Sequence, residues 1–256
     1  MKKILITGAN SYIGMSFENY MKDYEDYQID TLDMLNHNWR DFNFSGYDSV
    51  FHVAGLAHIK ETKENAKLYY KVNRDIAIEV AKIAKQSNVK QFIFLSSMSV
   101  YGLTVGIIDR DTEPFPVSNY GRSKLEAELV IKELTTDNFK VVIVRPPMVY
   151  GEGCKGNYVL LTKAALKLPI FPDIKNQRSM VHINKLCEYI KSYIDNKTSG
   201  VYFPQDEKYT CTTEMVKEIA KSHGRNIKTT KIFNPILRNI KSNLINKVFG
   251  DLIYKI

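Results

Sequence analysis

The chain has 256 residues, of which 44% are hydrophobic and 25% charged, which suits one globular domain or a domain with a small extra lobe and excludes a disordered protein. No apolar stretch approaches the roughly 18 residues needed to cross a membrane, and the apolar run after Met1 ends at once in a glycine turn, so we expect a cytoplasmic protein without signal peptide or transmembrane segment. The net charge is +8; no nucleic-acid-binding motif accompanies it, and we interpret it as a solvated surface with lysines spread along the chain, without a nucleic-acid partner.

Short apolar runs alternate with segments of helical periodicity along the first part of the chain. We predict strands over 4–6, 27–32, 50–53, 91–95 and 141–144, and helices over 12–21, 67–86 and 120–134. Continuously apolar strands separated by helices are typical of a parallel sheet that is covered on both faces. The sequence therefore predicts an α/β fold with a Rossmann-type doubly wound parallel sheet.

The pattern becomes less regular after the proline pair that follows residue 145. We expect residues 1–150 to form the nucleotide-binding domain and residues 151–256 a small C-terminal substrate lobe, some of whose segments return to the main sheet. Helices are predicted over 185–193 and 213–222. The tail over 233–256 is basic and apolar, and the sequence does not assign it to an element.

The cysteines and histidines predict no metal site. Cys154, Cys187 and Cys211 lie far apart and form no CxxC pair, which argues against a zinc site or a disulfide framework and fits a reducing compartment. His52 and His58 lack further ligands, and we expect both to be structural.

A glycine turn, TGANSYIG over residues 7–14, follows the first predicted strand and opens a helix. Such a turn lets the backbone approach a pyrophosphate, which the free amides and positive dipole end of the helix then bind. Asp33 ends the second strand, 19 residues beyond Gly14, where a carboxylate can bind the adenosine ribose and would repel a 2′-phosphate. This favours NAD(H), with NADP(H) as the alternative. The expected cofactor contacts are Gly8, Asn10, Ser11, Tyr12, Ile13, Gly14 and Asp33.

A tyrosine and a lysine four residues apart open the helix predicted from Tyr120. At this spacing Tyr120 and Lys124 share one helix face, and the ammonium is expected to lower the pKa of the phenol so that it can shuttle a proton. Ser97 lies 23 residues upstream, at the carboxyl end of a central strand, where doubly wound sheets bind their ligands. The same spacing recurs from Tyr193 to Lys197, but no serine-rich strand end precedes it.

These segments, with SSMSVYG over 96–102, YGRSK over 120–124 and RPPMVYG over 145–151, resemble the extended short-chain dehydrogenases of the nucleotide-sugar epimerase/dehydratase family. The resemblance runs from Lys3 to about Thr213, and Ser11 replaces the middle glycine of the family's turn. It implies a catalytic set of Ser97, Tyr120, Lys124 and Asn73. It also implies cofactor contacts from Lys124 and from Val53, Ala54 and Gly55, and substrate contacts from Ser99, Asn157 and Arg178. Arg178 would clamp a nucleotide diphosphate, whereas Asn157 either caps a helix or binds the diphosphate.

The resemblance further implies hydride transfer at C4 of a UDP-sugar. Dehydration is not expected, because Met98 stands at a position that needs a proton-transferring group. Two reactions remain open. Likeness to bacterial capsule-type enzymes and the small lobe favour reduction of a UDP-4-keto-6-deoxy-N-acetylhexosamine in surface polysaccharide biosynthesis, and 4-epimerisation is the alternative.

Three further alternatives concern the protein's role and its partners. A non-catalytic nucleotide-binding protein is a weaker alternative to an enzyme. The basic tail suggests a peripheral membrane contact. We also expect a homodimer that pairs through the helices that begin near Lys67 and Tyr120.

Overall fold

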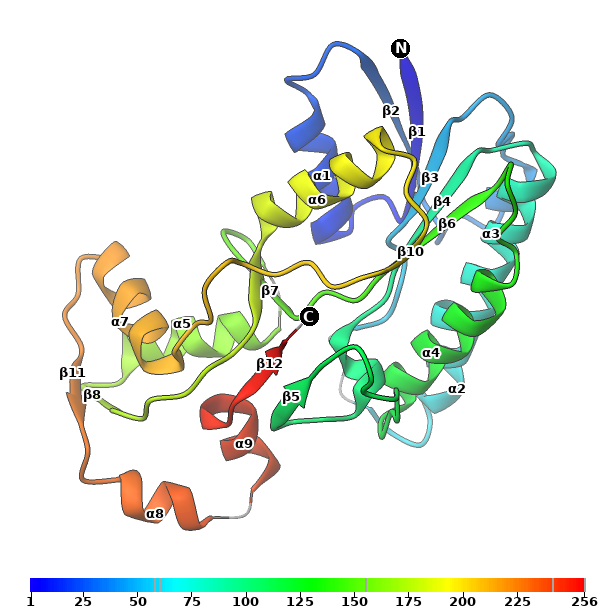
Figure 1. The fold of residues 1–256 in the computed structure, drawn as a ribbon. Helices are drawn as coiled ribbons and strands as arrows, with labels where there is room; N and C mark the ends of the chain where they lie inside the picture. Colours follow the sequence, from blue (N-terminus) through cyan, green and yellow to red (C-terminus); the bar gives the residue numbers. More distant parts are fainter. Residues whose placement is uncertain (58, 60, 155, 241, 256) are drawn as a thin grey trace.

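The computed structural model describes every residue except 58, 60, 155, 241 and 256, and it does not describe the side chains of residues 157, 238, 239 and 244. The main sheet contains six parallel strands: β1 (Lys2–Thr7), β2 (Tyr27–Leu32), β3 (Ser49–His52), β4 (Gln91–Leu95), β6 (Lys140–Val144) and β10 (Gly200–Tyr202). They lie in the order β10-β6-β4-β3-β1-β2 (Figure 1). The strand order reverses between β1 and β3, which confirms the doubly wound sheet.

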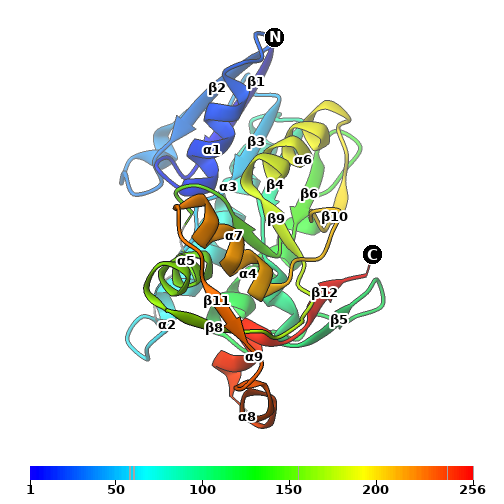
Figure 2. The ribbon, with the colours of Figure 1, turned by 90° about the vertical axis from the view of Figure 1, so that its left-hand side faces the viewer.

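Helices cover both faces of this sheet. On one face α1 (Tyr12–Met21) and α6 (Ile183–Asp195) pack side by side (Figure 2). On the other lie α3 (Ala77–Gln86) and α4 (Asn119–Lys132). Alternate residues of one strand enter different cores: Ile4 and Ile6 face α1 and α6, whereas Leu5 faces α3 and α4. Burial of both faces explains why the central strands contain unbroken apolar runs, such as Ile4 to Ile6 and Phe92 to Leu95.

The helix predicted over 67–86 is divided into three parts. It consists of α2 (Ala66–Tyr70), a π-helical turn (Lys71–Ile76) and α3. Single π-helical turns occur frequently at functional sites because they redirect one side chain out of the regular helical spacing. Here the turn contains Asn73, which is completely buried.

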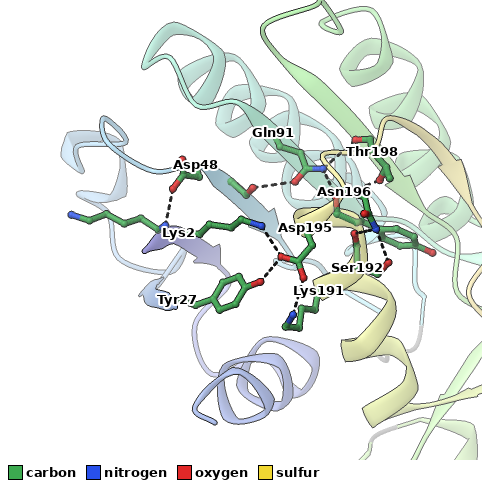
Figure 3. A network of polar contacts seen from close by, with 12 residues as sticks. Lys2, Tyr27, Asp48, Gln91, Lys191, Ser192, Asp195, Asn196 and Thr198 are labelled. Atoms are coloured by element: carbon green, nitrogen blue, oxygen red, sulfur yellow. Dashed lines mark hydrogen bonds and ion pairs between the residues drawn. The ribbon is translucent and has the colours of Figure 1, made fainter. Parts of the chain in front are cut away.

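The chain returns to the main sheet after the predicted lobe boundary, since α6 and β10 pack with the first domain. Asp195 at the end of α6 fixes this return (Figure 3): Lys2 Nζ and Lys191 Nζ each lie 2.7 Å from its carboxylate, and Tyr27 donates a further hydrogen bond. Burial alone would raise the pKa of Asp195, but the three hydrogen bonds outweigh it and lower the pKa to about 2.

The remaining segments lie outside the main sheet, and we call this part of the structure the lobe. Its helices are α5 (Asn157–Lys167), α7 (Thr212–Ser222), α8 (Asn234–Asn239) and α9 (Asn243–Phe249). Its strands form three short parallel pairs: β7 (Met148–Tyr150) with β9 (Met180–His182), β8 (Ile170–Pro172) with β11 (Lys228–Thr230), and β5 (Gly106–Ile108) with β12 (Leu252–Tyr254). Two 3₁₀ turns, Trp39–Asp41 and Met98–Tyr101, complete the elements.

The end of the tail is part of the fold. Strand β12 is buried, and the completely buried Tyr254 donates a hydrogen bond of 2.9 Å from its hydroxyl to the carbonyl oxygen of Arg145. A membrane contact over the whole of 233–256, as the sequence suggests, is therefore wrong for residues 252–254. No helix among the described residues is long and apolar enough to cross a membrane.

Candidate active site

The glycine turn after β1 is packed tightly against the loop after β3. Gly8 has φ +115°, and a Cβ atom there would lie 2.6 Å from the backbone nitrogen of Ala54 and 3.1 Å from a methyl carbon of Val53. Asn10 also adopts a left-handed conformation, with φ +64°. Only glycine fits at position 8, because a side chain there would collide with backbone. The amino-terminal end of α1 thus follows directly on a bare backbone turn.

Ser11, which replaces the family's middle glycine, caps α1. Its hydroxyl accepts a hydrogen bond of 3.1 Å from the backbone nitrogen of Gly14, so one amide at the helix end is already satisfied. Tyr12 and Ile13 pack against the core below. The buried Tyr12 hydroxyl has no hydrogen-bond partner among the described residues, and burial, reinforced by Cys154, raises its pKa to about 12.

Asp33 follows β2 and turns back on its own loop. Its Oδ1 atom accepts a hydrogen bond of 2.9 Å from the backbone nitrogen of Leu35. This local bond fixes the carboxylate at the carboxyl end of β2, the edge of the sheet from which the glycine turn also leaves.

Ser97 and Tyr120 face each other at the carboxyl end of β4. Ser97 Oγ caps the 3₁₀ turn by accepting from the Ser99 backbone nitrogen, and it lies 3.1 Å from Ser99 Oγ. Burial raises the pKa of Tyr120, and its hydrogen bond with Ser97 opposes this rise. The expectation of a lowered phenol pKa is wrong for this structure, because desolvation disfavours the phenolate more than its neighbours stabilise it.

Lys124 is buried one turn further along α4. Its Nζ atom donates a hydrogen bond of 2.8 Å to the carbonyl oxygen of Leu95 and lies 4.7 Å from the ring centre of Phe94. Burial lowers the pKa of Lys124 to about 8, although Glu128 raises it. A Cβ atom on Gly55 would lie 3.2 Å from this ammonium. A side chain at residue 55 would therefore crowd the Lys124 ammonium.

Asn73 connects that loop to α4. Its Oδ1 atom accepts from the Leu56 backbone nitrogen at 2.7 Å, and its Nδ2 atom donates to the Leu56 carbonyl oxygen at 3.1 Å and to Ser123 Oγ at 3.2 Å. Ser123 in turn donates to the Tyr120 carbonyl oxygen. Asn73 thus positions the loop and the helix relative to each other.

His52 has a structural role, as expected. Its Nδ1 atom lies 2.8 Å from Thr7 Oγ1, and its ring stacks between those of Phe92 and Phe94. Burial, with a contribution from Lys124, lowers its pKa to about 3, which keeps the ring neutral. His58 lies outside the described residues.

A buried ion pair behind the site was not predicted from the sequence. Arg145 Nη2 lies 2.5 Å from the Glu128 carboxylate, which also accepts a hydrogen bond from Ser96, and Arg145 Nη1 donates to the Tyr101 hydroxyl at 2.8 Å. Glu128 stands one helical turn after Lys124, so the spacing in the sequence already places the two side chains on one helix face. The pair holds the end of β4, α4 and β6 together beneath Ser97.

Of the expected substrate residues, the structure describes the contacts of Arg178 but not the side chain of Asn157. Arg178 lies in the lobe, where its Nη1 atom donates to the carbonyl oxygens of Gly250 at 2.9 Å and Asn246 at 3.5 Å, at the end of α9. Burial lowers its pKa. Helix α5 begins at Asn157 and Gly156 occupies its cap position, so Asn157 does not cap this helix; the side chain of Asn157 lies outside the described part.

Comparisons with known proteins agree with this geometry. The family described as "NAD dependent epimerase/dehydratase family" matches residues 4–203. A UDP-glucose 4-epimerase of Vibrio cholerae is 33% identical over 86% of this chain and 75% of its own length. The N-acetyl-alpha-D-glucosaminyl-diphospho-ditrans,octacis-undecaprenol 4-epimerase of Escherichia coli O157:H7 is 26% identical over 96% of this chain and 81% of its own length. The crystal structure of a dTDP-4-dehydrorhamnose reductase from Clostridium acetobutylicum shares the fold, with a TM-score of 0.75, 23% identity, and coverage of 89% of this chain and 82% of that chain.

Proposed function

Because the chain belongs to the NAD dependent epimerase/dehydratase family, we propose that it transfers a hydride between NAD(H) and C4 of a nucleotide-activated sugar. The observation that carries the proposal is the convergence of Ser97, Tyr120 and the buried Lys124 at the carboxyl edge of the sheet. A reducible carbonyl or an oxidisable hydroxyl placed against the phenol would exchange its proton there.

The chain's residues fit the dinucleotide. The turn at Gly8 is a cradle that a Cβ atom would fill, and the amino-terminal end of α1 adjoins it. NAD supplies the hydride-transferring group when bound. Asp33 would bind the adenosine ribose, which favours NAD(H) over NADP(H). Ser11 would contact the diphosphate by donating from its hydroxyl group, because the hydroxyl only accepts from Gly14 and the Ser11 backbone nitrogen already donates to the Gly8 carbonyl oxygen at 3.2 Å.

Each catalytic side chain would act on a proton or on another side chain. Tyr120 would move the proton at its phenol oxygen, and Ser97 would donate a hydrogen bond to the same substrate oxygen. The Lys124 ammonium would hold the nicotinamide ribose through hydrogen bonds. Asn73 is a positioning residue, because its hydrogen bonds go to the loop after β3 and to Ser123.

Of the two reactions, epimerisation and reduction, the relatives favour epimerisation. The Vibrio cholerae and Escherichia coli proteins are both named 4-epimerases, and the second name describes a lipid-linked diphospho-sugar. A UDP-hexose or UDP-N-acetylhexosamine is therefore the first substrate to test. Reduction of a UDP-4-keto-6-deoxy-N-acetylhexosamine is the second, since the same proton relay serves both and the sugar lobe is small. We retain Ser99, Asn157 and Arg178 as the proposed substrate contacts.

One pair of assays distinguishes the reactions. The purified protein is incubated with UDP-glucose or UDP-N-acetylglucosamine without added coenzyme, and separately with NADH or NADPH and UDP-2-acetamido-2,6-dideoxy-4-hexulose. Interconversion of C4 epimers in the first assay establishes the epimerase, and coenzyme oxidation with a 6-deoxy product in the second establishes the reductase. Nucleotide binding without turnover in either assay refutes hydride transfer on these sugars and favours a binding protein.

We also propose a cytoplasmic homodimer. Leu129 and Val130 on α4 and Leu68 on α2 are exposed apolar side chains on the two helices expected to pair. Light scattering of the purified protein, compared with a Leu129→Glu variant, tests this: a dimer that the substitution dissociates supports the interface, and a monomeric native protein refutes it.

A further inference from the structure

The net positive charge of the chain is concentrated in one segment. Residues 219–250 contain seven lysines and arginines and no aspartate or glutamate, whereas the whole chain has 36 basic and 28 acidic residues. Most of the net charge of +8 thus belongs to this segment, because acidic residues are missing from it while lysines are spread along the whole chain. An uninterrupted basic segment of this length attracts an anionic surface.

The same segment presents an exposed apolar surface. Ile232, Phe233, Ile236 and Ile240 are 78%, 46%, 62% and 43% exposed, and we call them the α8 stripe. Ile236 lies within α8, Ile232 and Phe233 directly precede this helix, and Ile240 directly follows it, so the stripe covers α8 and both of its ends. Four large apolar side chains in nine residues form a patch, not the scattered exposure that every soluble protein shows.

The stripe lies at an end of the molecule. In both Figure 1 and Figure 2, α8 forms the tip of the lobe beyond α9, remote from the N-terminus and from β1 and β2. The exposed Lys228 and Lys231 precede it, and the exposed Lys247 lies on α9. A projecting tip can meet a flat surface without steric hindrance from the main sheet.

We propose that the α8 stripe and the basic residues around it dock this protein on an anionic phospholipid membrane. Apolar side chains inserted among the acyl chains, with lysines at the headgroups, are how interfacial helices bind. A second copy of this chain fits less well, because two surfaces of like charge repel each other. A nucleic acid would pair with the lysines but leave the apolar side chains exposed to water. The proposal goes beyond the proposed function and holds for any sugar substrate.

The test uses the full chain and vesicles. Co-sedimentation is measured with vesicles of mixed phosphatidylglycerol and phosphatidylcholine, and with phosphatidylcholine alone. Binding is expected only to the anionic vesicles. The double variant Phe233→Ser/Ile236→Ser and the double variant Lys228→Glu/Lys231→Glu should each weaken it by on the order of tenfold or more, since both the buried apolar area and the charge contribute.

Matched controls make the outcome specific. Phe115→Ser removes an exposed aromatic ring outside the segment, and Lys82→Glu/Lys90→Glu makes the same charge change at exposed lysines in α3 and just before β4; both should bind as the native protein does. Thermal unfolding verifies that every variant is folded. Equal binding by the stripe variant and the native protein would overturn the proposal. Binding to a DNA duplex that the charge variant loses and the stripe variant keeps, without vesicle binding, would assign the segment to nucleic acid instead.

Discussion

Removing the buried carboxylate behind the active site should both destabilise the protein and shift its pH dependence. The Glu128 side chain is 4% exposed and that of Arg145 11%, and they are joined at 2.5 Å. In Glu128→Ala the guanidinium would remain buried without its counter-ion, and Ser96 would lose its acceptor.

The expected loss of stability is large. Deleting one partner of a buried pair costs about 3–5 kcal/mol, because the remaining charge stays desolvated. For a chain of this size each kcal/mol lowers Tm by roughly 2–4 °C, so Tm should fall by about 10 °C. Glu128→Gln keeps the shape and loses the charge, and should cost about 1.5–3 kcal/mol, the value of hydrogen bonds to a charged group.

The effect on catalysis follows from Lys124. Burial lowers the pKa of Lys124 to about 8 while Glu128 raises it. In Glu128→Gln that support is lost, so the pKa of Lys124 falls further and its ammonium form disappears at a lower pH. The alkaline limb of the kcat/KM profile should therefore move to lower pH.

The assay compares Glu128→Gln with Glu126→Gln by thermal unfolding and by pH–rate profiles. Glu126 lies on the same helix and pairs with Arg74 at 2.6 Å, but its side chain is 44% exposed, so its loss should cost at most about 1 kcal/mol. Equal Tm values and superimposable profiles for the two variants would refute the reasoning.

Three other predictions follow from single residues. Tyr120→Phe should reduce turnover by roughly 10²-fold or more with nucleotide binding retained in a calorimetric titration, and loss of binding would show a structural role. Gly8→Ala should weaken NAD binding and cost about 1–3 kcal/mol, because the new Cβ atom would lie 2.6 Å from the Ala54 nitrogen; unchanged urea unfolding and affinity would contradict this. The pKa of Asp195 in the folded protein, about 2, is below its ordinary value of 3.8. Its carboxylate therefore stabilises the fold above about pH 4, and this stabilisation, about 1 kcal/mol after solvent screening, is lost as the pH falls towards 2. Urea unfolding of Asp195→Asn should accordingly depend less on pH between these values than that of the native protein.

The elements that carry the proposed catalytic residues were predictable because their signals are local. Strands β1, β3, β4 and β6 each contain an unbroken apolar run, and α4 places a tyrosine and a lysine one turn apart, so a few neighbouring residues decide each element. The glycine turn is likewise local, since only glycine adopts the required conformation at residue 8. The exact role of Asn73 needed the structure, because the helical periodicity continues across it and conceals the π-helical turn.

The sequence by itself thus determined the doubly wound sheet and the positions of Ser97, Tyr120 and Lys124 at its carboxyl edge. Only the tertiary structure decided that β10 rejoins the sheet, that Glu128 pairs with Arg145, and that β12 is buried while α8 projects. The physical reason is the distance along the sequence between the residues that decide each feature. Strands of three residues show no period, and a buried ion pair or an exposed apolar stripe is defined by what packs around it, which depends on residues far away in the chain.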